Sequence, residues 1–177
     1  MIDPRAYAVA ETLKGGLAVT IRAQRFDDRE RVERATRELD RESIYLRLFS
    51  YRSELSADDI DRIMRFDPEH EVALLATIEE AGNEVVIGAG RYIVTNPQTA
   101  EVAFVVEEDY HGRGIASRLL HHLAAIARDH GIGTFEADVL VQNKPMQAVF
   151  NSTGWPCEKR RDGTSTHFVM TLPEKVA

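Results

Sequence analysis

A loop of small residues lies between an apolar strand pattern and a helix pattern in the second half of the chain. It reads His-Gly-Arg-Gly-Ile-Ala-Ser from His111 to Ser117. Gly112 and Gly114 allow the backbone to approach a ligand closely, and the N-terminus of the following helix presents free N–H groups with a partial positive charge. Arg113 adds a cation beside them. These residue types in this order predict a binding site for a phosphate or pyrophosphate group.

Three phosphate-bearing ligands compete for this loop. A dinucleotide-binding fold needs a third glycine, where the chain has Ser117, and a loop that turns directly off the strand, whereas the link Glu107–Tyr110 is too long. A phosphate-loop nucleotide site needs a Gly-Lys-Ser/Thr ending, which this loop lacks. The third candidate is the pyrophosphate of coenzyme A, and it agrees best with the loop.

The loop resembles that of the GNAT superfamily of acyl-CoA N-acyltransferases. The family's loop runs Gln/Arg-x-x-Gly-x-Gly/Ala, and here His111 stands first and Ala116 last. Downstream, the run from Asn143 through Phe150 to Trp155 resembles the family's second motif, Asn-…-Tyr-…-Gly-Phe. The resemblance covers roughly residues 19–172. It implies an α+β fold of mixed α/β layers, in which a six- or seven-stranded mixed twisted sheet carries helices on both faces.

The N-terminal half is similar to bacterial protein-lysine acetyltransferases that modify acyl-CoA synthetases. Val19–Arg22, Ser43–Phe49 and Val72–Leu75 stand in the order typical of those enzymes. This resemblance implies acetyl-CoA as cosubstrate, no metal, and a protein lysine as acceptor, for example on an acyl-CoA synthetase. Two other functions stay open. One is the same transfer to a small amine, such as a polyamine, amino acid or antibiotic, and the other is a coenzyme A-binding sensor with little turnover.

Glu101 is the candidate general base. Deprotonating a lysine ammonium at pH 7 costs about 4.6 kcal/mol, given a pKa near 10.4 and about 1.36 kcal/mol per pKa unit, and a carboxylate is a usual base for this task. Glu101 is a lone carboxylate at the start of an apolar strand. The family's histone acetyltransferases carry the base glutamate ten residues before the loop Gln, and Glu101 stands ten residues before His111. The alternative interpretation is that Glu101 is a solvated residue at a strand edge with no catalytic role.

The resemblance implies that the coenzyme contacts a strand, the loop and a later helix. Backbone groups of Val105 and Val106 would pair with the pantetheine arm like an added strand, and the N–H of Val106 would polarise the thioester carbonyl. Asn143 would hydrogen-bond the arm, although an N-cap alone also explains an Asn there. Phe150 replaces the tyrosine that protonates the leaving thiolate in many family members, so the general acid stays open. The implied contact residues are Val105, Val106, His111, Gly112, Arg113, Gly114, Ile115, Ala116, Ser117, Asn143 and Phe150.

Hydrophobic periodicity and turn signals predict the elements that position these residues. Residues 1–17 are predicted to be a short helical or loose lead-in, and residues 18–177 a single domain. The unit 101–141 should be a parallel, right-handed strand–helix–strand, with the coenzyme entering where its two strands diverge. Helices are predicted over 26–39, 44–49, from Ser56 onward, 115–130 and 143–152, and strands over 19–22, 72–78, 85–94, 101–106, 134–141 and 166–172.

Composition and charge exclude several classes of function. The formal net charge is −7, which argues against nucleic acid as the main partner and suits a cationic acceptor. No stretch approaches the ~20 apolar residues of a membrane helix, and we expect no signal peptide or membrane partner. Cys157 is the only cysteine, so no internal disulfide can form and a cytoplasmic location is favoured. His121 and His122 point in different directions on their helix, so they do not indicate a metal site.

Overall fold

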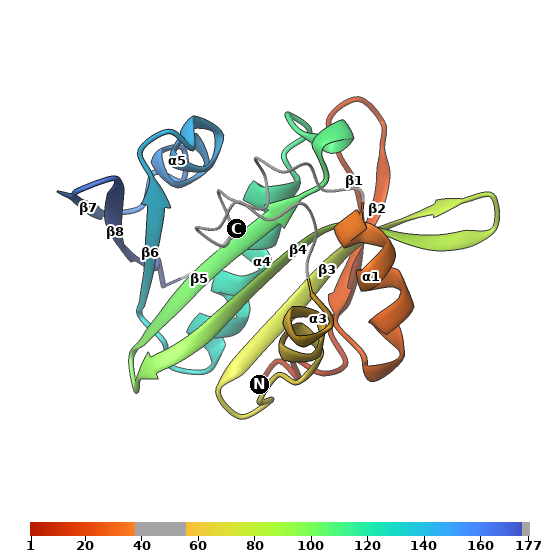
Figure 1. Ribbon diagram of the computed structural model, residues 1–177. Coiled ribbons are helices and arrows are strands. Elements are labelled where there is room, and N and C mark those ends of the chain that lie inside the picture. Colours follow the sequence, from red (N-terminus) through yellow and green to blue (C-terminus); the bar gives the residue numbers. More distant parts are fainter. Residues whose placement is uncertain (38–55, 175–177) are drawn as a thin grey trace.

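In the described part of the chain, eight strands form one sheet, and helices cover both of its faces (Figure 1). The computed structural model describes residues 1–37 and 56–174; the helix predicted over 44–49 and the end of the one predicted over 26–39 lie outside this part. The predicted fold class is confirmed, with eight described strands instead of six or seven. In the order β1-β2-β3-β4-β5-β6-β8-β7, only the described pair β5–β6 is parallel. The strands are β1 (Ala8–Thr12), β2 (Ala18–Ala23), β3 (Glu71–Glu80), β4 (Asn83–Asn96), β5 (Thr99–Val106), β6 (Thr134–Leu140), β7 (Cys157–Asp162) and β8 (Ser165–Thr171).

The helices divide between the two faces of the sheet (Figure 1). Helices α1 (Arg29–Arg37) and α3 (Ala57–Met64) lie on one face, called the front face below, and α4 (Ile115–Asp129) lies on the back face. The apolar stripe of α4 packs against β3, β4 and β5, and the side chains along it, such as Leu119 and Leu123, are fully shielded from solvent. The shorter helix α5 (Lys144–Asn151) follows β6.

Residues 1–17 contain a strand, so the predicted helical or loose lead-in is wrong. β1 pairs antiparallel with β2 at one edge of the sheet. Glu11 of β1 accepts hydrogen bonds from two guanidinium nitrogens of Arg118, at 2.9 and 2.6 Å, and one from Nε2 of His122, at 2.8 Å. Burial lowers the pKa of His122, so its neutral ring accepts a hydrogen bond at Nδ1 from the hydroxyl of Tyr7 at 2.5 Å. Contacts with α4, which is distant in the sequence, therefore hold β1 in place. No local sequence pattern indicates these contacts.

β7 is the other strand that the sequence analysis missed. Its sequence Cys-Glu-Lys-Arg-Arg-Asp has one half-buried residue, Cys157, followed by five exposed ones, so it lacks the apolar alternation that predicts a strand. Among the described strands it pairs with β8 alone, at the other edge of the sheet. Charged side chains at such an edge hinder the addition of further strands.

β5 and β6 diverge soon after they meet. Their parallel pairing covers only Thr99–Glu101 against Thr134–Glu136, although β5 continues to Val106 and β6 to Leu140. Beyond Glu101, the edge of β5 that faces β6 therefore has no strand partner among the described residues. The predicted divergence of these two strands is confirmed, and it opens the sheet between them.

A buried ion-pair network attaches the start of α1 to the sheet. The guanidinium of Arg22 on β2 donates to both carboxylate oxygens of Asp28, at 2.8 and 2.7 Å, and to Glu84 of β4 at 2.6 Å. Arg22 is 5% exposed and Asp28 is 0% exposed. The carboxylate of Asp28 also accepts a hydrogen bond from the backbone N–H of Arg25. Because buried charges need such partners, the network fixes the place where α1 crosses the front face.

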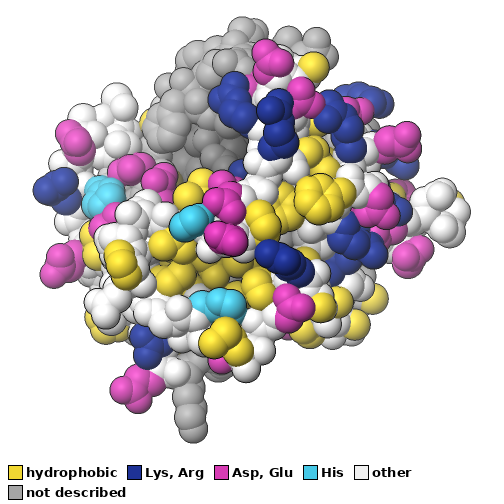
Figure 2. Space-filling model, turned by 90° about the horizontal axis from the view of Figure 1, so that it is seen from below, with side chains coloured by type: hydrophobic (Ala, Val, Ile, Leu, Met, Phe, Trp, Pro, Cys, Tyr) yellow, Lys and Arg dark blue, Asp and Glu magenta, His cyan; other side chains and the backbone are white. Residues whose placement is uncertain are grey.

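On the face shown in Figure 2, charged side chains of both signs surround a central area of hydrophobic side chains. Within residues 1–37 and 56–174, no helix combines the length and the apolar sequence that crossing a membrane would take. The same residues contain no group of three or more His, Cys, Asp or Glu side chains placed to hold a metal ion.

Candidate active site

The divergence of β5 and β6 produces a cleft of about 890 Å³. β5 forms one wall, β6 and α5 form the opposite wall, and the loop between β5 and α4 closes one end. Glu101 lines this cleft, and so does every residue predicted to contact the coenzyme except Arg113. The guanidinium carbon of Arg113 lies 5.8 Å from the centre of the Tyr110 ring. The predicted residues that line the cleft are Glu101, Val105, Val106, His111, Gly112, Gly114, Ile115, Ala116, Ser117, Asn143 and Phe150.

The loop at the end of the cleft offers backbone groups to an anion. Gly112 and Gly114 have φ angles of 77° and 83°, in the left-handed region that favours glycine. Gly114 is the N-cap of α4, no described side chain caps this end of the helix, and the first turn carries no acidic residue. The N–H groups of this turn therefore keep their partial positive charge for an anion in the cleft.

Replacing Gly114 with Ala should weaken the binding of coenzyme A and also destabilise the fold. A side chain in the left-handed region costs about 1–2 kcal/mol, and relief of that strain would move the N–H groups that face the anion. Gly131, just beyond the other end of α4, has a φ of 84° and is the matched control. Calorimetric titration with coenzyme A and thermal unfolding should show similar destabilisation in Gly114→Ala and Gly131→Ala, but weaker binding only in Gly114→Ala. Equal affinities would mean that this loop does not hold the coenzyme.

His111 joins the loop to the end of β5. Its Nε2 lies 2.8 Å from the carbonyl oxygen of Val106, and because a carbonyl only accepts, Nε2 carries the proton. The N–H of Glu107 donates to the carbonyl of Ile87 on β4. Backbone groups of successive strand residues point to opposite sides, so the N–H and C=O of Val106 point toward the cleft. His111 therefore donates a hydrogen bond to the carbonyl oxygen of Val106, and the N–H of Val106 remains available to a ligand.

The same alternation points the backbone groups of Val105 and Val106, both predicted to contact the coenzyme, in opposite directions. Backbone groups of Val105 point toward β4, where this residue pairs with Ala89. Of the two, only Val106 offers main-chain hydrogen-bonding groups to the cleft, whereas Val105 lines it with its side chain. Phe104, two residues before Val106, offers its N–H and C=O on the cleft side as well.

Replacing His111 with Gln should preserve acetyl-CoA affinity, whereas Ala should lower it. The glutamine amide can donate the same hydrogen bond to Val106, and losing one such bond costs about 0.5–1.5 kcal/mol. We therefore expect the KM for acetyl-CoA to rise about two- to tenfold in His111→Ala, with a smaller change in kcat, and to recover in His111→Gln. A KM in His111→Gln as high as that in His111→Ala would contradict this positioning role.

Glu101 lies beside the cleft on the front face. It pairs with Ile93 of β4 and Glu136 of β6. Val102 and Phe104 are buried in the core, so alternation places Glu101, with Ala103 and Val105, on the front face. The lining of the cleft includes Glu101, Asp138 and Asp162 and, among the described residues, no Lys or Arg. This charge favours a cationic group near Glu101.

Asn143 and Phe150 lie on the wall opposite β5. The side-chain oxygen of Asn143 accepts a hydrogen bond from the N–H of Met146 at 3.2 Å, which makes Asn143 the N-cap of α5. Its side-chain NH2 group remains available to a ligand. Phe150 is 2% exposed, and its ring centre lies 6.2 Å from that of Phe104 and 5.3 Å from that of Phe168. This side chain therefore packs as part of the aromatic base of the cleft.

The residues that line the cleft include several with hydroxyl groups, among them Tyr110 and Ser152. The hydroxyl of Ser152 donates to the carbonyl of Val149 at 2.9 Å. Burial, followed by the charge of Glu107, raises the pKa of Tyr110, so this hydroxyl keeps its proton at neutral pH.

Sequence reasoning missed the acidic residues on the far wall. Asp138 lies on β6 and Asp162 ends β7. Asp138 accepts a hydrogen bond from Nδ1 of His167, at 2.8 Å. The alternation along 134–141 places Ala137 and Val139 in the core and indicates that Asp138 points the other way. Its place in the cleft depends on the divergence of the strands, which no local pattern encodes.

One protein family and several known proteins are similar to this chain. Residues 34–155 match the Acetyltransferase (GNAT) family. The GNAT domain of PAT from S. lividans is 34% identical, with a TM-score of 0.83 over 93% of this chain and 97% of that one. Acetyltransferase PA5475 of Pseudomonas aeruginosa is 26% identical over 156 residues, which are 88% of this chain and 84% of that protein. The PaiA N-acetyltransferase from Thermoplasma acidophilum, in complex with coenzyme A, shares the fold with a TM-score of 0.62 at 18% identity, over 86% of this chain and 98% of that one. The chain therefore belongs to the acetyltransferase (GNAT) family and is an acetyl-CoA-dependent acyltransferase.

Proposed function

We propose that the protein transfers the acetyl group of acetyl-CoA directly to the side-chain amine of a protein lysine. The observation that carries the proposal is a single cleft with an uncapped helix N-terminus at one end and Glu101 on the strand that forms one wall. Acetyl-CoA supplies the acetyl group as an activated thioester. Family membership and the complex of PaiA N-acetyltransferase with coenzyme A support this donor.

The cleft offers a suitable partner to each part of the coenzyme. The loop His111–Ser117 would hold the pyrophosphate through backbone N–H groups. The main-chain groups of Phe104 and Val106 would pair with the pantetheine amides, as an extended ligand pairs with a strand edge. Asn143 would add a side-chain hydrogen bond from the opposite wall.

Glu101 would act as general base and Val106 as an electrophilic hydrogen-bond donor. Glu101 takes a proton from the lysine ammonium, directly or through a water molecule, so that the free amine can attack. The N–H of Val106 donates to the oxygen on which negative charge develops. A thiolate with a conjugate-acid pKa near 8.5 is a tolerable leaving group, and Tyr110 is the hydroxyl we assign to its protonation. No covalent acyl-enzyme is required.

The proposed acceptor is a lysine side chain exposed on a protein, for example an acyl-CoA synthetase. The likeness to the GNAT domain of S. lividans PAT supports a protein acceptor. The acidic lining of the cleft supports a cationic one. A small amine remains the second candidate, because the acidic lining of the cleft suits any cationic amine. We also propose a cytoplasmic location, which the free thiol of Cys157 supports.

Two acceptor panels test the proposal. Acetyl-CoA turnover, measured as released thiol, would be followed with acyl-CoA synthetases and other lysine-bearing proteins, and separately with polyamines, amino acids and aminoglycosides. Protein acetylation with a lysine site identified by mass spectrometry would support the proposed acceptor. Turnover on small amines only would remove the protein acceptor and keep the chemistry. Tight acetyl-CoA binding without turnover on either panel would identify a sensor.

A further inference from the structure

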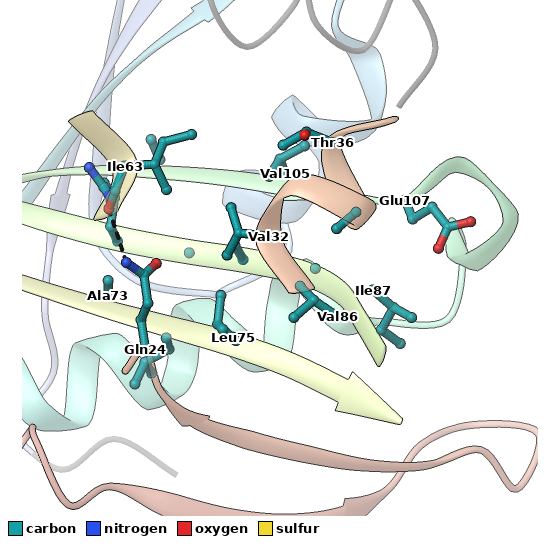
Figure 3. A pocket seen from close by; sticks show the side chains of 17 residues that line it. Gln24, Val32, Thr36, Ile63, Ala73, Leu75, Val86, Ile87, Val105 and Glu107 are labelled. Carbon is teal, nitrogen blue, oxygen red and sulfur yellow. Dashed lines mark hydrogen bonds between the residues drawn. The ribbon is translucent and has the colours of Figure 1, made fainter. Parts of the chain in front are cut away.

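A second cavity, of about 140 Å³, lies between the front face of the sheet and α1 (Figure 3). Val32, Ala35 and Thr36 of α1 cover it, and small or apolar residues of β3, β4 and β5 form its base. The polar residues of its lining are Gln24, Thr36, Arg91 and Glu107. Nε2 of Gln24 and one guanidinium nitrogen of Arg91 each donate to the carbonyl of Ile63, at 2.9 and 3.1 Å. The other residues that line the cavity are apolar or small.

The cavity and the cleft have part of their lining in common, in the middle of β5. Ala103 and Val105 line both spaces. Their side chains lie on the front face, as does that of Glu101, and they follow Glu101 by two and four residues along β5. A part of a bound ligand that extends from the cleft past Ala103 and Val105, on the front face and under α1, would therefore enter the second cavity.

We propose that this cavity binds the acyl chain of thioesters longer than acetyl-CoA. The inference rests on the proposed function, because that function places the thioester carbonyl against β5, at the N–H of Val106. The acceptor amine must approach the carbonyl from solvent and stop there, so the acyl chain is the part of the reactants that can extend beyond the carbonyl into an apolar space. An apolar cavity of about 150 Å³ holds a benzene molecule, so this one has room for about four to six carbon atoms.

The apolar lining predicts how affinity should depend on chain length. Each methylene group removed from water should tighten binding about fourfold until the cavity is full. Calorimetric Kd values for coenzyme A and its acetyl, propionyl, butyryl and decanoyl thioesters should therefore fall stepwise to butyryl. Decanoyl-CoA should bind less tightly than butyryl-CoA. The kcat/KM values with one amine acceptor should follow the same order.

Two substitutions test the cavity itself. Ala35→Leu fills it from α1, so the ratio of butyryl-CoA to acetyl-CoA affinity should fall about tenfold. Arg34→Leu places the same side chain on the exposed side of α1 and is the control in which this ratio should stay as in the unmodified protein. Val32→Ala enlarges the cavity and should raise the affinity for hexanoyl-CoA relative to butyryl-CoA.

The outcomes separate this inference from the proposed function. Two results would overturn the acyl-chain site and leave the proposed function standing. One is that acetyl-CoA binds and turns over but propionyl- and butyryl-CoA bind no more tightly. The other is that Ala35→Leu and Arg34→Leu lower the ratio of butyryl-CoA to acetyl-CoA affinity equally. Failure to bind coenzyme A in any form would overturn both. A stepwise gain that Ala35→Leu abolishes and Arg34→Leu retains would establish the site.

Discussion

Replacing Glu101 with Gln should lower acetyl transfer about 10²- to 10⁴-fold, the range that general base catalysis contributes. Glutamine retains the size of the side chain and its place in β5 but cannot accept the ammonium proton at neutral pH. Because the main-chain contacts proposed for the coenzyme do not involve this side chain, the Kd of acetyl-CoA should change little. Turnover in Glu101→Gln should recover at high pH, as more of the acceptor is already deprotonated.

Glu136 provides the matched control for this experiment. It is the same residue type, it lies in register with Glu101 on the adjacent strand, and it does not line the cleft. Glu136→Gln should lower kcat/KM far less than Glu101→Gln. Equal losses in the two variants would indicate a shared electrostatic effect, and unchanged turnover in Glu101→Gln would remove Glu101 as the base.

Replacing Asp28 with Ala should reduce the free energy of unfolding by about 3–5 kcal/mol, because it leaves a buried guanidinium without its main partner. Asp28 is 0% exposed and receives two hydrogen bonds from Arg22. Glu84 would still contact Arg22, which limits the loss. Urea unfolding measures the effect. Asp27→Ala is the control, since the side chain of Asp27 is 74% exposed and exposed changes cost within about 0.5 kcal/mol. Similar losses in the two variants would refute the role given to the buried network.

The same network predicts acid sensitivity. Burial alone would raise the pKa of Asp28, but hydrogen bonds from Arg22 and from the N–H of Arg25 outweigh it, so the pKa lies below its usual 3.8. A carboxyl with a depressed pKa in the folded state stabilises the protein above the unfolded-state pKa, and this contribution is lost as pH falls through the folded-state value. Urea midpoints measured from pH 7 down to pH 3 should decline less steeply at the acid end for Asp28→Asn than for the unmodified protein.

The centre of the site could be predicted from the sequence because the elements that form it are consecutive along the chain. The strand of Glu101, the loop, α4, β6 and α5 occur in unbroken order, and each has a local pattern. The strand–helix–strand connection then brings the two parallel strands side by side. The predicted divergence of the strands and the fold class were confirmed on this basis. The roles of the individual residues remain proposals.

Features that depend on distant contacts could not be predicted. β1 is held by the contacts of Glu11 with α4, and β7 is an exposed, charged edge strand. The cavity under α1 arises where small residues from four elements meet, among them Ala35, Ala73, Ala89 and Ala103. Alanines have no distinctive pattern of their own, so only the assembled structure shows that they surround a space.

Beyond Glu101, no described strand pairs with the edge of β5 that faces β6, and this affects how much the side chains along that edge can vary. Backbone N–H and C=O groups are common to all residues but proline, so a ligand that pairs with them places little demand on side-chain identity along that edge. The side chains of the same strand stay free to serve other needs, such as the core packing of Phe104 and the cavity wall at Val105. A scaffold built in this way can keep one donor molecule while the residues around it diverge to suit different acceptors and acyl groups.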